Sequence, residues 1–376
     1  MTIGRGVGQS MRAAVLRAVG APISIERIEL EPPRATEVRV RIKAAGVCHS
    51  DYHFVTGDLA TPLPAVLGHE GAGIVEEVGA GVTSVAPGDH VVLLWRTSCG
   101  RCALCQTGRP ALCTTGLRAR SAGLLDDGSS RLARQGEHLH HVLGVSCFAE
   151  QVVCSDRSVL GIPATMPMEI AALLGCAVMT GVGAVVNTAQ VRPGSSVLVI
   201  GAGGVGQCVV MGARLAGASS IVVADVSAAK LDAAKALGAT HLVNSSAEDL
   251  VKAVRGVTDG GVEYAFEAVG RPDTLGQAMR ALRPGGTAVA VGLGRGDARV
   301  EVGINDLVLQ EKTLKGSLYG SSRPAADAPM LIKLYQSGQL PLDRLLSRRY
   351  PLEQINEAYA AMLGGEVARS VVIPST

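Results

Sequence analysis

The sequence carries no excess of charge of either sign. Its 376 residues include 35 Lys and Arg against 33 Asp and Glu, so the formal net charge is only +2, and the basic residues are dispersed. Proteins that bind nucleic acid or a charged membrane surface concentrate basic residues in one region. We therefore expect neither nucleic acid nor a membrane among its partners.

The sequence also lacks a long unbroken apolar run. Residues 1–10 (MTIGRGVGQS) contain no apolar core of a secretory signal, so we expect a short disordered leader before a first strand at Met11. The longest uncharged run, 170–191, is interrupted by Gly, Cys, Asn and Gln, which favours a buried helix over a membrane span. With nine Cys and no export signal, we expect a cytoplasmic protein whose thiols bind metal rather than form disulfides.

The length of the chain favours two domains. Residues 11–45 form short alternating runs separated by Pro and Gly, and the pattern continues at 71–82 and 88–94, which is typical of antiparallel β-structure. From Met168 onward, strand and helix patterns alternate. Strands are expected at 196–200, at a run ending at Asp225, and at 241–244, 262–270, 286–293 and 313–320, with helices near 247–255 and 273–282. This alternation predicts a doubly wound parallel sheet, and hence an α/β fold class.

The last segment indicates that the second domain is inserted into the first. It contains a helix near 327–337 and a final strand at 369–374, which we expect to return to the β-rich domain. The expected boundaries are 1–177 for the first domain, 178–319 for the second and 320–376 for the return.

Four cysteines in the run SCGRCALCQTGRPALC have the spacing of a metal site. They are Cys99, Cys102, Cys105 and Cys113. Four thiolates can close a tetrahedral zinc site with no open position, the form that a structural zinc takes. An iron–sulfur cluster of the bacterial ferredoxin type would have a shorter last gap and a Pro after the last Cys. Unrelated surface thiols are the other alternative. The spacing favours structural zinc.

A second group of candidate ligands lies between Gly46 and Gly71. This window holds one Cys, three His and three carboxylates, with Cys48 and His69 on either side of a loop rich in Pro and Gly. A thiolate and an imidazole suit a catalytic zinc, and carboxylates nearby can orient the imidazole. A loop with scattered polar residues is the alternative.

Three further histidines end the long Gly-, Ser- and Arg-rich loop expected at 114–142. They are His138, His140 and His141. We expect them to be ordinary loop histidines, because the two expected metal sites have enough ligands without them.

The second domain opens with a dinucleotide-binding fingerprint. Gly201, Gly203 and Gly206 fit G-x-G-x-x-G between a β-branched run and a helix, and Asp225 ends the next strand. The glycines would let the backbone approach a pyrophosphate at the helix N-terminus. Asp225 would accept a hydrogen bond from the ribose 2′-OH and repel a 2′-phosphate, so NAD is favoured over NADP. A glycine-rich turn that binds no nucleotide is the alternative.

The motifs of the chain, in order, are CHSD, GHE, CGRCALC, GCAVMTG and GAGGVG with the Asp that follows it. The order of these motifs resembles that of the zinc-dependent medium-chain alcohol dehydrogenases, in particular the liver-type enzymes and their formaldehyde-dehydrogenase relatives. The resemblance runs from about Met11 to the C-terminus. It implies a GroES-like catalytic domain and a Rossmann domain. It also implies reversible oxidation of primary medium-chain or aromatic alcohols to aldehydes, two zinc ions per chain, NAD, and a homodimer or homotetramer.

The resemblance also assigns the catalytic zinc to Cys48, His69 and Cys176. The zinc would keep one coordination position open to the alcohol oxygen and lower the pKa of the alcohol hydroxyl. The resulting alkoxide would then transfer a hydride to the nicotinamide ring. Asp51 would hold His69, and Glu70 would lie behind the zinc.

A proton relay and the binding contacts follow from the same resemblance. Ser50 would take the alcohol proton, and His53, whose imidazole can change its charge near neutral pH, would pass it to solvent. His49 and Arg369 would contact the pyrophosphate, Thr180 the nicotinamide, and Asp225 and Lys230 the adenosine ribose. The full set of expected cofactor contacts is His49, Thr180, Gly201, Gly203, Gly204, Val205, Gly206, Asp225, Lys230, Val269, Gly292, Leu293, Tyr319 and Arg369.

Two details concern rate and specificity. The family often has Arg at the position of His49. Because His binds phosphate less tightly than Arg, NADH would dissociate faster, which would raise turnover if NADH release is the slow step. The expected substrate pocket is apolar, which suits medium or aromatic alcohols, and the single Trp should narrow it. Its residues are Leu59, Trp95, Phe148 and Leu318.

Two alternatives stay open. In the formaldehyde branch, a hydroxymethyl–thiol adduct would need basic residues for its carboxylates. Arg118, Arg120 and Arg131 lie in the right loop, whereas the TPLP stretch at 61–64 and Leu59 favour the plain alcohol branch. The other alternative is a non-catalytic dinucleotide-binding zinc protein, which the complete set of zinc ligands and Ser50 disfavours. Zinc-free reductases are disfavoured on the same ground.

Overall fold

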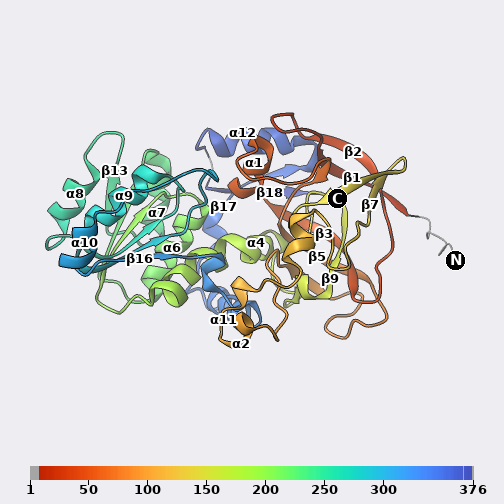
Figure 1. The fold of residues 1–376 in the computed structure, drawn as a ribbon, viewed down its shortest axis with the longest axis horizontal. Helices are drawn as coiled ribbons and strands as arrows, with labels where there is room; N and C mark the ends of the chain where they lie inside the picture. Colours follow the sequence, from red (N-terminus) through yellow and green to blue (C-terminus); the bar gives the residue numbers. More distant parts are fainter. Residues whose placement is uncertain (1–7, 367, 375–376) are drawn as a thin grey trace. The chain divides into compact units, whose positions relative to one another are not determined.

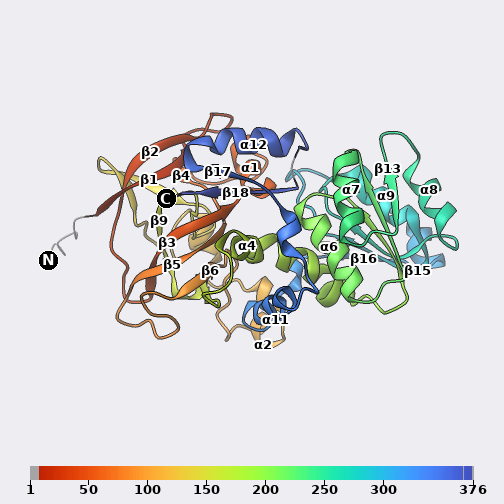
Figure 2. The same ribbon diagram turned by 180° about the vertical axis from the view of Figure 1, so that it is seen from behind.

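The structure, a computed structural model, describes residues 8–366 and 368–374. The chain divides into two units, which Figures 1 and 2 present from opposite sides. The first unit runs to Cys176 and resumes at 348–364 and from Arg369 onward. The second unit begins at Ala177 and runs to Ser347, with a short further segment just before Arg369. The insertion expected from the sequence is therefore present.

The chain returns to the first unit later than expected. The first boundary differs by one residue from the expectation, but the return begins at 348 and not at 320. The intervening helix α11 (Pro324–Gln336) packs on α5 (Met179–Gly183) of the second unit. Nδ2 of Asn187 also donates to Oδ2 of Asp327 at 3.0 Å. These contacts hold α11 in the second unit.

The first unit is built from largely antiparallel β-structure, as expected. A closed barrel has the order β1 (Gln9–Leu16), β2 (Ser24–Leu30), β7 (Leu132–Arg134), β8 (Glu137–His141) and β4 (Ala65–Val66). The other sheet of this unit has seven strands. Six of them follow the order β10 (Val159–Gly161), β6 (His90–Leu93), β5 (Glu70–Val78), β3 (Glu37–Gly46), β18 (Arg369–Ile373) and β17 (Leu346–Pro351). The seventh, β9 (Gln151–Ser155), pairs with β3. The expected return of the final strand is confirmed, because β18 pairs antiparallel with β3.

Short helices complete the first unit. They are α1 (His49–Thr56), α2 (Ala103–Gln106), α3 (Leu117–Ser121), α4 (Met168–Leu173) and α12 (Ile355–Leu363). Val38, Val40 and Ile42 of β3 are fully buried, because alternate residues of a strand share one face and here that face is the core.

Two expectations for this unit were wrong. The first strand begins at Gln9, and Gln9 pairs with Leu30, so the end of the expected leader is part of the sheet. Residues 1–7 lie outside the described residues. The expected loop at 114–142 contains α3 and the β7–β8 hairpin, which places the three histidines on β8. Their alternation with apolar residues is weak, which is why the strand was not recognised.

The second unit contains the expected parallel sheet. Its order is β13 (His241–Asn244), β12 (Ser220–Asp225), β11 (Ser196–Ile200), β14 (Val262–Glu267), β15 (Leu282–Ala290) and β16 (Thr313–Gly316). All five strand pairs are parallel, and the order reverses between β11 and β14. Ligands of such sheets bind outside the carboxyl ends of the strands at the reversal.

Helices cover both faces of this sheet. α6 (Gly204–Leu215) and α7 (Ala228–Leu237) pack together over β11, β12 and β13, and α8 (Leu250–Val257) and α9 (Pro272–Ala281) form a second pair. α10 (Ile304–Leu309) precedes the edge strand β16. The uncharged run forms a 22-residue helical stretch, Met168–Ala189, long and apolar enough to cross a membrane. Because 89% of its most apolar window is buried inside the protein, it is a core helix, as expected.

Candidate functional site

Two strand ends and one helix bring the expected catalytic zinc ligands together within the first unit. Gly46 at the end of β3 pairs with Glu70 at the start of β5, so Cys48 and His69 emerge from neighbouring strand ends. Cys176 follows α4, which packs against both strands. Residues separated by more than a hundred positions thus meet at one point.

The ligand atoms converge on a buried point. The sulfurs of Cys48 and Cys176, a ring nitrogen of His69 and a carboxylate oxygen of Glu70 all lie within 4.8 Å of one another. Ligands at normal zinc distances stand about 3.3–3.8 Å apart in a tetrahedral site. All four residues are buried. Two thiols and an imidazole are the donors that zinc prefers, so the residues fit zinc and not calcium or magnesium.

Asp51, in the first turn of α1, supports His69. Its Oδ2 lies 2.9 Å from Nδ1 of His69, and its Oδ1 accepts from the backbone N–H of Gly68 at 3.2 Å. Burial lowers the pKa of His69, but the charges of Asp51 and Cys48 outweigh it and raise that pKa well above its ordinary value. With Nδ1 facing Asp51, Nε2 faces the other ligands, 4.0 Å from Oε1 of Glu70.

The two thiols of this centre interact directly. The neighbouring thiol of Cys176 holds the pKa of Cys48 well below its usual value, while Cys48 raises the pKa of Cys176 well above it. The Cys48 thiol therefore ionises before that of Cys176. Because metal ligands must be thiolates, metal binding would release any proton that remains on the two sulfurs.

Arg369 lies beside this centre, which the sequence did not predict. Its Nη2 donates to Oε1 of Glu70 at 2.7 Å, and its Nη1 donates to the carbonyl oxygen of Val47 at 2.7 Å. Nη2 also lies 3.7 Å from Sγ of Cys48. Arg369 is only 5% exposed, and burial raises the pKa of Glu70 to about 8 despite this pairing. Its predicted pyrophosphate contact stays a prediction beside this observed role.

α1 also carries the residues of the expected proton relay. Ser50 and His53 are three positions apart, so they lie on one face of the helix, and both are partly buried. His49 is exposed, and its ring centroid is 5.1 Å from that of His53. Nδ1 of His53 lies 3.3 Å from Oδ2 of Asp58. The roles of these residues stay predictions.

The expected pocket residues occupy different surroundings. The ring of Trp95 meets that of His69 edge to face, with centroids 5.9 Å apart, and Leu59 is partly exposed. Phe148 is fully buried, and its ring centroid is 6.3 Å from that of Tyr359, so its place in the pocket wall stays a prediction. Leu318 belongs to the second unit and is partly buried.

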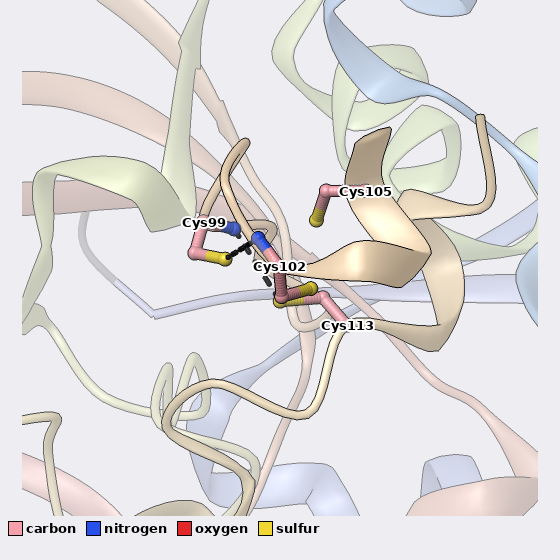
Figure 3. Close-up of side chains that lie close together, drawn as sticks. All are labelled: Cys99, Cys102, Cys105 and Cys113. Carbon is pink, nitrogen blue, oxygen red and sulfur yellow. Dashed lines mark hydrogen bonds between the residues drawn. The ribbon is translucent and has the colours of Figure 1, made fainter. Parts of the chain in front are cut away.

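The four cysteines of the second candidate metal centre also converge. Figure 3 shows the side chains of Cys99, Cys102, Cys105 and Cys113 pointing toward a common space, and their sulfurs lie within 4.8 Å of one another. The backbone N–H groups of Cys102 and Cys99 approach the sulfurs of Cys99 and Cys113 at 3.3 and 3.4 Å. Hydrogen bonds from Thr115 and backbone N–H groups lower the pKa of Cys99 to about 5. Four sulfurs, with no further donor grouped with them among the residues that the structure describes, fit a closed structural zinc site.

The histidines of β8 belong to neither metal cluster found among the described residues. His141 is fully buried, and its Nε2 accepts from the backbone N–H of Arg131 at 3.3 Å. Burial lowers the pKa of His141 to about 3. His141 is therefore a neutral core residue.

Two of the three arginines considered for a thiol adduct are used inside the first unit. Arg131 is fully buried and donates to Oε2 and Oε1 of Glu37 at 2.9 and 2.6 Å. Arg120 is buried and donates to the Thr97 hydroxyl at 2.6 Å. Arg118 is exposed.

The glycine fingerprint lies in the turn between β11 and α6. Gly201 has φ +94°, which favours glycine, and a Cβ at Gly206 would lie 1.7 Å from the carbonyl oxygen of Gly201. A Cβ at Gly203 would meet nothing within 4 Å. The turn therefore needs Gly201 and Gly206 for its own packing, while Gly203 leaves room in front of the α6 N-terminus. Gly204 and Val205 form the first turn of α6.

Asp225 ends β12 at the same edge of the sheet. Its Oδ2 accepts from the backbone N–H of Ala202 at 2.7 Å, and its Oδ1 accepts from that of Ser227 at 2.9 Å. Lys230 follows in the first turn of α7 and is partly buried. The carboxylate is thus fixed beside the glycine turn, where a nucleotide ribose would lie.

The loops after β14 and β15 border the same edge. Val269 and Leu293 are 44% and 46% exposed, and a Cβ at Gly292 would lie 2.3 Å from the backbone nitrogen of Gly270. Oε1 of buried Glu267 accepts from the N–H groups of Val269 and Gly270 at 2.9 and 2.8 Å. The two other expected contacts, Thr180 and Tyr319, are both buried in the second unit.

Comparison with known proteins agrees with this architecture. The sequence-family model of the alcohol dehydrogenase GroES-like domain matches residues 34–164. The sequence-family model of the zinc-binding dehydrogenases matches residues 204–337. The benzyl alcohol dehydrogenase of Acinetobacter calcoaceticus is 35% identical, with a TM-score of 0.93 over 98% of this chain and 100% of that one. An alcohol dehydrogenase zinc-binding domain protein of Burkholderia ambifaria is 42% identical, with the same TM-score and the same coverage. The chain belongs to the zinc-dependent medium-chain alcohol dehydrogenases.

Membership of this family makes the chain an oxidoreductase and makes zinc and a nicotinamide dinucleotide its cofactors. The alternative of a non-catalytic zinc protein is thereby removed. A Sinorhizobium meliloti protein assigned as a zinc-binding dehydrogenase and bound to NADP is 30% identical, with a TM-score of 0.80 over 97% of this chain and 100% of that one. The family therefore leaves the choice between NAD and NADP to each member's own residues.

Sequence reasoning missed three residues around these sites. Glu267 and Glu37 are buried carboxylates, and no spacing pattern marks either of them. Glu267 accepts from nearby backbone N–H groups, and Glu37 accepts from the distant guanidinium of Arg131. Asp58 was visible as one of the carboxylates in the catalytic window. The signal that could have identified it was its position five residues beyond His53 and just after Gly57, the glycine that ends the helix.

Proposed function

We propose that this enzyme oxidises primary alcohols, aromatic or of medium chain length, reversibly to aldehydes with NAD as hydride acceptor. The observation that carries the proposal is the buried set of two thiols, an imidazole and a carboxylate, with Trp95 edge to face against His69. An aromatic wall beside the metal ligands suits an apolar substrate. The likeness to a benzyl alcohol dehydrogenase supports the same substrate class.

Cys48, His69 and Cys176 would hold the catalytic zinc, which supplies Lewis acidity when bound. Asp51 keeps the His69 ring oriented through Nδ1. Ser50 would accept the proton that leaves the alcohol hydroxyl, and His53 would carry it to solvent. The other four cysteines would hold a structural zinc, so we expect two zinc ions per chain.

NAD is the proposed dinucleotide because Asp225 presents a fixed carboxylate beside the glycine turn. A 2′-phosphate there would meet a like charge, whereas a 2′-OH could donate to it. Gly203 leaves the space that a pyrophosphate would occupy at the α6 N-terminus. Asp225→Gly should lower kcat/KM for NAD and raise it for NADP, measured with one alcohol. Unchanged preference in that variant would remove Asp225 as the selector.

The plain alcohol branch is favoured over the thiol-adduct branch by the arginines. An adduct would need free cations at the pocket, but Arg131 is paired with Glu37 and Arg120 is bonded to Thr97. Only Arg118 of the three is exposed.

A second copy of the chain is the proposed partner. Ile304, Val308 and Leu309 of α10 are 76%, 65% and 78% exposed, and all four residues of the edge strand β16 are exposed. An apolar surface beside an open strand edge suits pairing with an identical edge. Light scattering should give a homodimer or homotetramer, which Val308→Glu should dissociate. We also expect the protein in the cytoplasm, where thiols stay reduced.

The deciding experiment is NADH formation by the zinc-loaded enzyme from a panel of primary alcohols. Parallel reactions contain formaldehyde mixed with a low-molecular-weight thiol. We expect turnover of benzylic or medium-chain alcohols that does not depend on thiol, and loss of that turnover in Cys176→Ser with the fold retained. Turnover with the adduct alone would refute the proposed substrate class and point to Arg118.

A further inference from the structure

The turn that ends α1 fixes an acidic side chain beside a histidine of the same helix. Gly57 ends the helix with φ 80° and ψ 8°, and the backbone N–H of Leu59 donates to the carbonyl oxygen of His53 at 3.0 Å. This hydrogen bond closes a seven-residue turn, 53–59, and the chain reverses at the left-handed glycine that ends the helix. Asp58, between the two, is therefore directed back toward the last turn of the helix.

Neighbouring contacts hold this turn in place. A Cβ at Gly57 would lie 2.8 Å from Cγ1 of Val19, and the N–H of Gly20 donates to the carbonyl oxygen of Val55 at 2.7 Å. The backbone around Asp58 is thus fixed by packing and by hydrogen bonds. A side chain on such a turn loses little further conformational freedom when it forms a contact.

Asp58 makes two contacts through one oxygen. Its Oδ2 lies 3.3 Å from Nδ1 of His53 and accepts from the hydroxyl of Thr56 at 2.7 Å. The His53 side chain is 13% exposed and that of Asp58 is 26% exposed, so the pair is partly shielded from water. This burial distinguishes it from an exposed surface ion pair, which contributes little.

These contacts determine which ring nitrogen of His53 carries the hydrogen. An ionised carboxylate can only accept hydrogen bonds, so Nδ1 must donate to Asp58. In the neutral imidazole, Nε2 is then the nitrogen with the free lone pair. Without Asp58, the ring would distribute between two tautomers and rotate about its side-chain bonds.

We propose that Asp58 is a positioning residue, which holds the Nδ1 hydrogen of His53 so that Nε2 receives the proton released by the alcohol. The proposal rests on the proposed function, because it takes the relay role of His53 from there. In the step, the alcohol O–H and C–H bonds would break and the C=O bond of the aldehyde would form. The proton would reach Nε2 through the Ser50 hydroxyl, the hydride with its electron pair would pass to NAD, and His53 would then return its proton to water.

The test is a double-mutant cycle on the zinc-loaded enzyme, read as the single-turnover rate of NADH formation from a saturating alcohol. Asp58→Asn keeps the size of the side chain but can donate to Nδ1, and so favours the wrong tautomer. We expect it to slow turnover about ten-fold, in the range of partners that orient a functional histidine. In the His53→Gln background, Asp58→Asn should have no further effect.

A readout besides activity is the nitrogen NMR spectrum of histidine-labelled protein, which reports the tautomer. We expect His53 protonated at Nδ1 in the unmodified protein and at Nε2 in Asp58→Asn. The matched control is Asp343→Asn, since Asp343 accepts from the Tyr335 hydroxyl at 3.0 Å in the second unit and should leave rate and tautomer unchanged.

Two results would overturn the proposal: an Nε2-protonated His53 in the unmodified protein, or a slowing by Asp58→Asn that persists without His53. A full rate in His53→Gln would also overturn it, together with the relay, while alcohol oxidation itself would stand. If no alcohol is oxidised, the proposed function fails, and the tautomer measurement still decides whether Asp58 orients His53.

Discussion

The buried pair between Arg131 and Glu37 gives a sharp test of how the first unit is stabilised. Arg131 is fully buried and Glu37 is 6% exposed at its side chain, and both carboxylate oxygens accept from the guanidinium. Asp127, 33% exposed, supplies a third contact at 2.6 Å. Glu37→Gln keeps the shape of the side chain and leaves the guanidinium with one ionic partner.

The magnitude follows from the uncompensated charge. Removing one partner of a buried ion pair costs about 3–5 kcal/mol. We take the lower end, about 3 kcal/mol, because Asp127 remains beside Arg131. For a unit of this size, that loss lowers the melting temperature by about 6–12 °C. The control Glu137→Gln removes an exposed partner of Arg17, with side chains 50% and 32% exposed, and should cost at most about 1 kcal/mol.

The assay is thermal unfolding of the zinc-loaded protein by circular dichroism, together with alcohol turnover well below the transition. We expect Glu37→Gln to melt well below the control while turnover is retained. A melting temperature equal to that of the control would refute the reasoning about burial. Normal melting with lost turnover would instead place Arg131 in substrate binding.

Three further predictions address pH, metal and cofactor. Burial lowers the pKa of His141 to about 3, against about 6.5 in an unfolded chain. As pH falls, the unfolded state therefore takes up the proton first. The free energy of unfolding should fall between about pH 6.5 and about pH 3, by at most about 1.4 kcal/mol per pH unit. Urea unfolding at a series of pH values should show a shallower fall in His141→Gln. Cys105→Ser should reduce bound zinc from two ions to one per chain by metal analysis and destabilise the first unit. Two retained ions would contradict the assignment of the four cysteines to a structural zinc. Gly203→Ala should weaken NAD binding, measured by calorimetry, with little change in the melting temperature. Gly206→Ala should destabilise the fold, because the new Cβ would lie 1.7 Å from the carbonyl oxygen of Gly201.

Local pattern was enough to predict the second unit. The strands at 196–200 and 241–244 were predicted with the bounds that the structure has, and β12 ends at Asp225 as predicted, because a strand buried on both faces is a short apolar run between turn residues. β14, β15 and β16 overlap the predicted strands at 262–270, 286–293 and 313–320 but end earlier. The four-cysteine set was predictable because ligand chemistry restricts residue type and spacing, whereas Cys176 came from the family resemblance. The extent of the return segment was not predictable, because α11 is held by packing on α5 and not by its own sequence.

The sequence by itself determined the family, the four-cysteine set and the glycine turn, because each depends on residue identity within short motifs. Cys176 lies more than a hundred positions from Cys48 and His69, so only the family resemblance and the fold place it with them. Only the tertiary structure decided what the charged side chains outside those motifs do. Arg369 reaches Glu70 across 299 positions, and Arg131 reaches Glu37 across 94. Such pairings join segments that lie far apart in the sequence and meet only in the folded chain, and no local pattern encodes that adjacency.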